Sequence, residues 1–282
     1  MIMTIFGDSV VPRGGVIWLS SIVEFARELG LAESLIRTSA LRLIYDGWLV
    51  REQVGKRAYY SMSGEYSDAD AAYQSQIYSP SAALRQNGWT IFRPLSDRLD
   101  RKSSDKLRRL LGQYGFGQLA PHVMIHPSIG KSAVQHIFSI CGEEAGVTFF
   151  TNELGPSAES IRFLVESAWD LSEIRKGYEE FLADFGELPD TLTIARPAPA
   201  TAFALRTLMI HRFRRLALRD PRLPNSLLPA DWPGEKSFDL VSMAYRNLLP
   251  ESEAYLDQRF VAKDDAIPVA ENRLLQRFRA SG

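Results

Sequence analysis

The strongest constraint in the sequence is a pair of helical patterns near its start, each closed by a glycine. Residues 16–29 carry a broad apolar stripe at helical spacing, and Gly30 follows in the position of a C-cap glycine. A second helical pattern covers residues 33–46 and stops at Gly47. Because glycine readily adopts the left-handed conformation that ends a helix, we expect two separate helices joined by a tight turn.

A hairpin pattern follows these helices directly. Residues 48–54 and 57–62 are strand-like runs, and Gly55-Lys56 separates them. A two-residue connection that contains glycine is typical of a β-hairpin. Two helices followed by a hairpin predict that residues 1–66 form a winged helix-turn-helix domain. Such a domain binds double-stranded DNA with one helix in the major groove and the hairpin beside it.

The charge of this segment supports that interpretation. Residues 34–60 contain five basic and two acidic side chains, whereas the whole chain has a net charge of -1. If the second helix reads DNA, Arg37 and Thr38 near its start are placed to reach base edges. The candidates for phosphate contacts are Arg42, Lys56 and Arg57.

A plainer interpretation of the same charges stays open. Residues 1–66 as a whole carry seven basic and seven acidic side chains. The basic residues near the hairpin are then solvated charges on an ordinary α+β fragment, with no nucleic acid involved.

The rest of the chain divides by composition and periodicity. Residues 67–88 shift to Ser, Ala, Gln, Asp and Tyr and are predicted to be a connector. Residues 89–155 alternate strand-like and helix-like runs, which predicts a central ferredoxin-like βαββαβ domain. Residues 156–282 lose the strand signal, so we expect a mainly α-helical C-terminal domain. The expected fold class is multidomain α+β.

Particular elements follow from the same patterns. In the central domain, strands are predicted at 89–92, 123–125 and 147–150, and helices at 98–111 and 131–140. In the C-terminal domain, long helical patterns cover 157–185, 200–218 and 235–249. Prolines between residues 221 and 233 predict an ordered loop there, since proline does not continue a helix.

Composition sets limits on the function. Cys141 is the only cysteine, which excludes an intrachain disulfide and any zinc site that needs two thiolates. Residues 1–7 are apolar but lack the cationic start of a signal peptide, and no window reaches the 18 apolar residues of a membrane span. We therefore expect a cytoplasmic protein that does not bind membranes.

A second cluster of charge lies late in the chain. Residues 206–222 hold six arginines and one acid, whereas residues 153–190 hold ten acids and three bases. An arginine-rich helix can bind the phosphates of a nucleotide-type ligand, and we nominate Arg212, Arg215 and Arg219 for that role. The alternative is that these arginines pair with the acidic stretch and only support the fold.

Signals for catalysis are weak. The sequence contains none of the common motifs for a nucleophile elbow, a phosphate loop, a dinucleotide site or a zinc protease. His122 and His126 lie four residues apart, which on a strand is about 13 Å and too far to share a metal. Asp97 follows the first central strand, where a metal nuclease of this fold can place a carboxylate, but a single aspartate is a weak signal. We expect no catalytic residues, no metal and no cofactor.

Several stretches resemble the PaaX family of repressors of phenylacetate catabolism. In the first 50 residues they are Thr4-Ile5-Phe6-Gly7-Asp8, Pro12-Arg13-Gly14-Gly15, Arg37-Thr38, Arg42-Leu43 and Asp46-Gly47-Trp48-Leu49. Further along they are Gly115-Phe116-Gly117, Trp169-Asp170-Leu171, Arg219-Asp220-Pro221, Leu223-Pro224, Leu228-Pro229 and Asp231-Trp232-Pro233-Gly234. The matches keep their order over nearly the whole chain, which makes them more specific than any single motif.

The resemblance implies a winged helix, a central domain similar to a CRISPR-associated nuclease subunit, and a helical C-terminal domain. It also implies a homodimer that represses an aromatic-acid catabolic operon and leaves its operator DNA when phenylacetyl-coenzyme A binds as inducer. Two alternatives remain: a regulator of the same build that responds to another acyl-coenzyme A or a free aromatic acid, and an enzyme that uses the winged helix for protein contacts.

Overall fold

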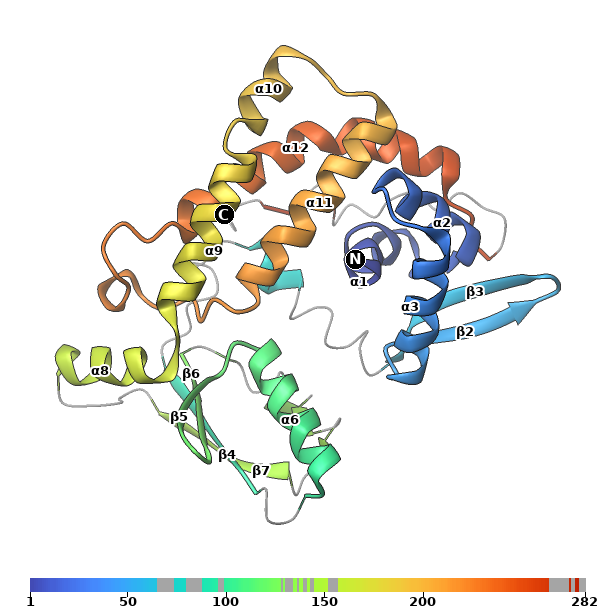
Figure 1. Ribbon diagram of the computed structural model, residues 1–282. Helices are drawn as coiled ribbons and strands as arrows, with labels where there is room; N and C mark the ends of the chain where they lie inside the picture. Colours follow the sequence, from blue (N-terminus) through green and yellow to red (C-terminus); the bar gives the residue numbers. More distant parts are fainter. Residues whose placement is uncertain are drawn as a thin grey trace. The chain divides into compact units, whose positions relative to one another are not determined.

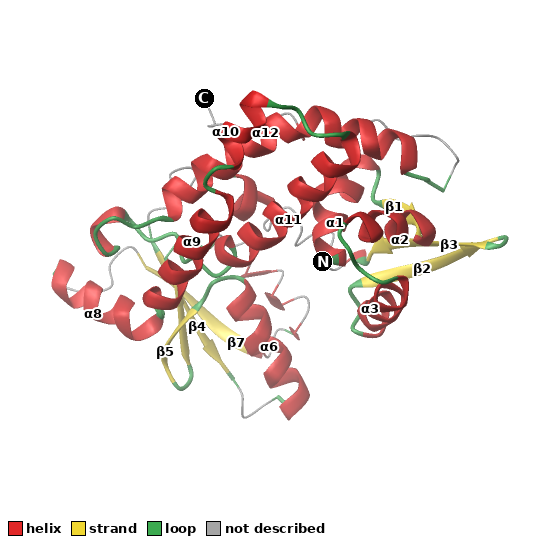
Figure 2. Ribbon diagram, turned by 45° about the horizontal axis from the view of Figure 1, so that its top comes forward, coloured by secondary structure: helices red, strands yellow, loops and turns green. Residues whose placement is uncertain are grey.

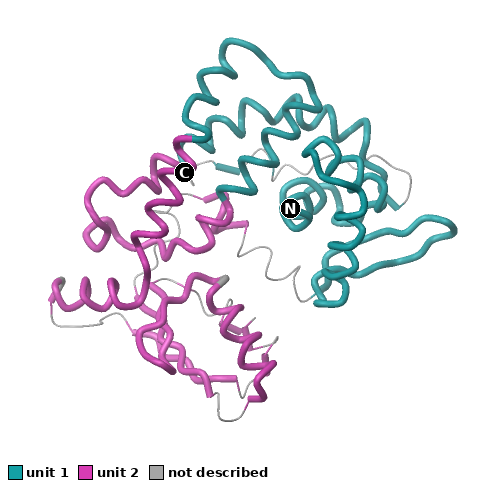
Figure 3. The backbone as a smooth tube through the Cα atoms, in the orientation of Figure 1, with its two compact units in different colours: residues 1–70, 184–213, 238–279 teal, residues 71–183, 214–237, 280–282 magenta. Residues whose placement is uncertain are grey.

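The computed structural model describes residues 1–64, 74–79, 88–95, 99–127, 129, 134–135, 137–138, 141–142, 145–151, 157–263, 274 and 277–278. These residues form a mixed α+β fold with two small sheets and a mainly helical C-terminal half (Figures 1 and 2). The chain divides into two compact units (Figure 3). Unit 1 comprises residues 1–70, 184–213 and 238–279, and unit 2 comprises residues 71–183, 214–237 and 280–282.

Unit 1 begins with short helical turns and then builds a three-stranded sheet. In order, its first elements are α1 (Ile2–Ile5), the π-helix η1 (Phe6–Val10), the 3-10 turn η2 (Val11–Arg13), β1 (Val16–Trp18), α2 (Leu19–Glu28), α3 (Glu33–Tyr45), β2 (Leu49–Val54) and β3 (Arg57–Met62). The strand order is β1-β3-β2, with β3 antiparallel to both neighbours. A short strand before α2 is thereby joined to the hairpin.

The predicted second helix and the hairpin are confirmed as α3, β2 and β3. Gly30 and Gly47 have φ angles of 72° and 78°, the left-handed backbone expected after each helix. The predicted first helix was wrong at its start, because Val16–Trp18 is strand β1 and α2 begins only at Leu19. The cause is long-range: these residues pair with residues 59–61 of β3, and no local pattern reveals that partner.

Three later helices complete unit 1. They are α10 (Leu188–Ile194), α11 (Pro199–Ala217, in unit 1 up to Phe213) and α12 (Gly234–Arg259, in unit 1 from Phe238). The rings of Phe25 in α2, Phe203 in α11 and Tyr255 in α12 meet in one core, with centroids 5.2 Å apart for Phe25–Phe203 and 5.0 Å for Phe203–Tyr255. The N-terminal elements therefore share a hydrophobic core with helices from the last third of the chain.

Helix α12 also corrects the predicted end of a helix at residue 249. It continues through Pro250 to Arg259. A proline inside a helix costs about 3 kcal/mol or more. Tyr255 and Leu256, beyond the proline, are buried in the unit 1 core, and this packing offsets that cost.

A charged cluster lies inside unit 1, and Arg206 of α11 is at its centre. The Arg206 side chain is fully buried, with its guanidinium 3.0 Å from Asp8 Oδ2 and 2.6 Å from Glu253 Oε1. It also donates a hydrogen bond to Ser9 Oγ at 3.0 Å. Burial opposes the charge, but the attraction of Asp8 and the other groups around it outweighs burial and raises the Arg206 pKa above its usual value.

Two further arginines complete the cluster. Arg13 contacts Glu253 at 2.6 Å and Asp257 at 2.7 Å. Arg277 donates hydrogen bonds to Asp8 Oδ1 and to the backbone oxygen of Gly7, each at 2.9 Å. Three guanidinium groups thus face three carboxylates, and the network ties η1 and η2 to α11, α12 and residue 277.

Unit 2 contains a four-stranded antiparallel sheet. Its strands are β4 (Trp89–Pro94), β5 (Gly117–Ala120), β6 (Val123–His126) and β7 (Gly146–Thr151), in the order β5-β6-β4-β7. The helices of unit 2 include α6 (Arg101–Gln113), α8 (Ala158–Ala168) and α9 (Leu171–Phe185, in unit 2 up to Ala183). Phe92 is fully buried and packs against Phe116 and Phe138.

The predicted elements of the central region correspond well with those described. Strands β4, β6 and β7 and helix α6 lie where expected, within three residues at each end. Strand β5 was missed, because its Gly-Phe-Gly start suggests only a turn.

The predicted helices of this region differ in outcome. The one at 131–140 falls largely outside the described residues, although 134–135 and 137–138 are helical. Trp169 separates α8 from α9 within the pattern at 157–185, and its indole donates a hydrogen bond to the Gly115 backbone oxygen at 2.9 Å.

His126 supplies a prediction about pH. The side chain lies in the core of unit 2, and burial lowers its pKa from 6.5 to about 3, against the effect of a hydrogen bond with the Tyr114 backbone. The folded protein keeps this imidazole neutral where the unfolded chain protonates it. The free energy of unfolding should therefore fall by up to about 1.4 kcal/mol per pH unit as pH drops from 6.5 toward 3.

Urea denaturation between pH 7 and pH 4 tests this prediction. The His126→Gln variant, which carries no titrating group, is expected to lose less stability than the wild type over this range. His122→Gln is the matched control, because His122 is exposed. Equal acid sensitivity in His126→Gln and the wild type would contradict the assignment.

Candidate nucleic-acid interface

The predicted reading helix is α3, and its polar residues are exposed. Arg37 forms an ion pair with Glu33 at 2.7 Å, and Arg42 lies 3.9 Å from Asp46. Both pairs join residues one helical turn apart, which stabilises the helix by only a few tenths of a kcal/mol. Neither arginine is buried, so both can exchange these partners for phosphate groups.

Thr38 is also exposed on α3, but part of its hydrogen-bonding capacity is used within the helix. Its hydroxyl donates to the backbone oxygen of Ser34 at 2.9 Å. The side chain therefore has a methyl group and an acceptor oxygen left for an external partner. The acceptor oxygen can take a hydrogen bond from a donor group on a base edge, and the methyl group can contact an apolar substituent of a base.

The hairpin of β2 and β3 carries the other predicted contacts. It extends from the helices of unit 1 as a two-stranded ribbon (Figures 1 and 2). Lys56 lies in the turn and Arg57 starts β3, and both are exposed. The Arg57 guanidinium lies over the Trp18 ring, 5.0 Å from its centroid. This cation–π contact helps to hold the Arg57 side chain in place beside the turn. The ribbon thus offers cationic side chains away from the core.

Sequence reasoning missed the apolar part of this surface. Leu35, Leu41 and Tyr45 of α3 have exposed fractions of 52%, 57% and 88%. All three lie off the apolar stripe of the helix. That position in the sequence pattern was the available sign that these apolar side chains are exposed.

The predicted ligand arginines are separated by the unit boundary. Arg212, in unit 1, forms an ion pair with Asp184 at 2.8 Å, and both side chains are about half exposed. Asp184 belongs to the acidic stretch named above, so the kind of pairing that the alternative expects is present at Arg212. Arg215 and Arg219, in unit 2, are exposed. Hydrogen bonds from Ser172 and Glu173 lower the pKa of Asp170, and the charge of Arg219 adds to that effect.

Arg222, from the same cationic run, is buried and supports the fold of unit 2. Its guanidinium donates hydrogen bonds to the backbone oxygens of Gln76 and Ser79. Its backbone N–H donates to Asp220 Oδ1 at 2.7 Å, and Tyr178 donates to the other carboxylate oxygen at 2.9 Å. These contacts fix the loop that precedes α12.

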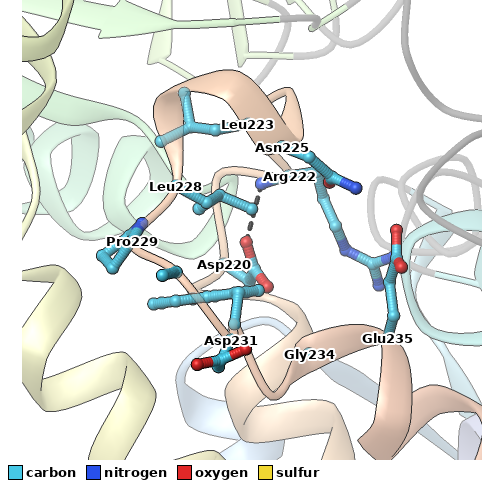
Figure 4. A pocket seen from close by; sticks show the side chains of 11 residues that line it. Asp220, Arg222, Leu223, Asn225, Leu228, Pro229, Asp231, Gly234 and Glu235 are labelled. Carbon is cyan, nitrogen blue, oxygen red and sulfur yellow. Dashed lines mark hydrogen bonds between the residues drawn. The ribbon is translucent and has the colours of Figure 1, made fainter.

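A cavity of about 250 Å³ lies within this loop region of unit 2 (Figure 4). Asp220 and Arg222 form part of its wall, and the Arg222 side chain runs toward Glu235 at the start of α12. Asp231 lies on the side opposite Leu223. The wall holds three carboxylates and one guanidinium, so its charge does not suit a phosphate group.

Metal and membrane sites find no support in the part of the chain that the structure describes. Its residues contain no group of three or more His, Cys, Asp or Glu side chains that could hold a metal ion. Within the same residues, none of the helices has the length and apolar character needed to cross a bilayer. Asp97, the position considered for a nuclease, lies outside the described residues.

The chain is similar to known proteins over nearly all its length. Residues 1–66 match the family described as PaaX-like protein, and residues 169–258 match the PaaX-like protein C-terminal domain. A relative from Escherichia coli (strain K12), described as transcriptional repressor PaaX, is 32% identical over 282 residues, covering 99% of this chain and 89% of the relative. A solved structure of an uncharacterized protein from Mycobacterium tuberculosis is 20% identical, covers 84% of this chain and 90% of its own, and has a TM-score of 0.46. The chain belongs to the PaaX family of transcriptional repressors.

Proposed function

We propose that the protein binds operator DNA through residues 1–66, which act as a winged helix-turn-helix domain, and represses a phenylacetate catabolic operon. The observation that carries this proposal is the exposed helix α3 followed at once by a projecting cationic hairpin. The sheet order β1-β3-β2, with β1 before α2, supports the same assignment. The Escherichia coli relative, described as a transcriptional repressor, supports the repressor role. The phenylacetate operon is what the family resemblance implies.

We propose further that residues 89–155 form the ferredoxin-like domain, residues 67–88 the connector and residues 156–282 the helical domain. The strand order β5-β6-β4-β7, with every pair antiparallel, supports the ferredoxin-like assignment. The protein acts as a homodimer in this proposal. A two-fold axis presents two α3 helices to a pseudo-palindromic operator, with half-sites about one helical turn or a multiple apart.

The proposed inducer is an aryl-acyl-coenzyme A such as phenylacetyl-coenzyme A. Arg212, Arg215 and Arg219 are the proposed contacts to its phosphates, since they are exposed cations that can bind phosphate in bidentate fashion. The thioester favours a state of the protein that does not hold DNA. Another acyl-coenzyme A or a free aromatic acid is the alternative inducer, and an enzyme acting on such thioesters is the less favoured class.

Fluorescence anisotropy with duplexes tiled from the protein's own upstream region tests these proposals together. One duplex is expected to bind tightly at low salt and to be released by phenylacetyl-coenzyme A. Replacing Arg212, Arg215 and Arg219 together by alanine should spare DNA affinity and weaken that release. Binding that ignores the thioester would point to another inducer, and turnover of the thioester without DNA binding would favour the enzyme.

The proposed phosphate-binding residues have their own test. Affinity falls as salt rises, and each cation that binds a phosphate makes this fall steeper. Removing one such cation should reduce the steepness of log affinity against log salt by about 0.9, so the double variant Lys56→Ala/Arg57→Ala should reduce it by about 1.8. Arg42→Ala should reduce the steepness by about 0.9. Arg108→Ala is the matched control, because Arg108 is an exposed arginine on α6 in unit 2. If Arg42→Ala and Arg57→Ala bind as the wild type does, the proposed docking of α3 and the hairpin is wrong.

A further inference from the structure

The exposed face of α3 has an apolar character that phosphate binding does not explain. Ile36 and Ala40 face the core, being 2% and 0% exposed. At 100° per residue, Thr38 falls opposite them, at the middle of the outer face. Leu41 falls on one side of Thr38 and Leu35 on the other, and both are more than half exposed. An outer face that includes two leucines beside a threonine is unusual for a surface whose only role is to attract an anion.

The charges of α3 point in the same direction. The helix and its C-cap carry Glu33, Arg37, Arg42 and Asp46, which sum to zero. The ion pairs Arg37–Glu33 and Arg42–Asp46 balance them within the helix. The hairpin, by contrast, carries a local excess of positive charge, because Arg51, Lys56 and Arg57 lie there against Glu52 alone. Glu52 is itself paired with Lys263 at 2.6 Å. The hairpin therefore supplies the excess of positive charge that attracts the DNA backbone, whereas the charges of α3 cancel and its leucines are available for non-ionic contacts.

The major groove offers one apolar partner for such contacts. The 5-methyl group of thymine is the only apolar substituent on the base edges there, and aliphatic side chains recognise it. Leu35 and Leu41 are six residues apart, so they lie about 9 Å apart along the helix axis. At 3.4 Å per base pair, that distance spans about three base pairs. Thr38, whose side chain also carries a methyl group, lies midway between them in the sequence.

We propose that Leu35 and Leu41 read thymine methyl groups in the operator half-site, and that they make α3 selective for thymine at two positions about three base pairs apart. The occupant of this face is duplex DNA, because the cationic hairpin that follows α3 is complementary to its phosphates. This inference rests on the proposed DNA-binding function and adds to it the class of base sequence that is read.

The test replaces thymine by deoxyuridine, which removes only the methyl group. In the duplex that the wild-type protein binds, each thymine is replaced singly, and affinity is measured by anisotropy. Two positions in each half-site are expected to weaken wild-type binding about fourfold each, the loss for one buried methyl-sized group. Leu41→Ala should bind more weakly than the wild type and become insensitive to deoxyuridine at one of these positions while keeping its sensitivity at the other. Leu35→Ala should show the converse pattern.

Leu208→Ala serves as the matched control, because Leu208 is a partly exposed leucine on α11 in unit 1. It is expected to keep the wild-type response to every deoxyuridine. Specific, salt-sensitive binding that ignores all thymine methyl groups would overturn the inference and leave the proposed function standing. A change of oligomeric state in Leu35→Ala and Leu41→Ala, with deoxyuridine sensitivity unchanged, would overturn it in favour of a contact between copies. Absence of specific binding to any duplex would instead reject the proposed function.

Discussion

Replacing Arg206 by methionine is expected to lower the free energy of unfolding by about 3–5 kcal/mol. Methionine fills much of the same volume but carries no charge, so the cluster keeps three carboxylates and only two guanidinium groups. Asp8 still has Arg277, and Glu253 still has Arg13, but both buried carboxylates lose their contact with the Arg206 guanidinium. The loss of a partner from a buried ionic network is far more costly than its contribution as an intact pair.

Urea denaturation followed by far-UV circular dichroism measures this effect. Arg212→Met is the matched control, because Arg212 lies on the same helix and its ion pair with Asp184 is about half exposed. It should change stability by less than about 1 kcal/mol. Adding Asp8→Asn to Arg206→Met removes the excess negative charge and should recover part of the loss. A loss in Arg206→Met no greater than in the control would show that the cluster does not support unit 1.

Replacing Phe203 by alanine is expected to cost about 3–5 kcal/mol of unfolding free energy. Phe203 lies one turn before Arg206 on α11 and is fully buried. Its ring contacts Phe25 from the N-terminal elements and is stacked on Tyr255 from α12. Truncation therefore leaves a cavity between three segments that are distant in sequence, and the close packing of the core limits how far they can move to fill it.

The same denaturation measurement applies, with Phe163→Ala as the control. Phe163 is on α8 and its exposed fraction is 70%, so its removal should change stability by about 0.5 kcal/mol or less. Equal losses in the two variants would contradict the role given to Phe203. The prediction is independent of DNA binding and can be checked on the purified protein alone.

Local signals predicted the elements that local interactions determine. Helix α3 lies between Gly30 and Gly47, which both have the expected left-handed backbone, and the hairpin follows Gly47 directly. The order of these elements along the chain needs no distant partner. Strand β1 could not be found in this way, because Val16–Trp18 becomes a strand only through pairing with β3. The continuation of α12 past Pro250 likewise depends on a core to which Phe25 and Phe203 contribute.

The candidate site was partly predictable for a related reason. Exposed residues such as Lys56 and Arg57 are recognised by charge and by position in the hairpin. Their sequence gives no sign that Arg57 lies over Trp18, since the two are far apart along the chain. Glu33 and Arg37, by contrast, are four residues apart on one helix, and this spacing is sufficient to predict the ion pair found in α3.

Arg206 shows the limit of reasoning from charge. In the sequence it is one of six arginines in a cationic run, and nothing distinguishes it from Arg215. In the structure it is fully buried with carboxylates on two sides, whereas Arg215 is exposed. The acids that surround Arg206 come from residues 8 and 253, so only the tertiary fold separates a core arginine from a ligand candidate.

The contact between Asp8 and Arg277 has a consequence for how the protein is made. A ribosome produces residue 277 long after residue 8, since the two are 269 positions apart. The helices that bring Phe203, Arg206 and Glu253 to the N-terminal elements are also late in synthesis. The nascent N-terminal elements therefore emerge without most of their core and without the cations that neutralise Asp8. Unit 1 completes its folding only after nearly all of the chain has been translated, so the early apolar residues of its core stay exposed throughout most of synthesis.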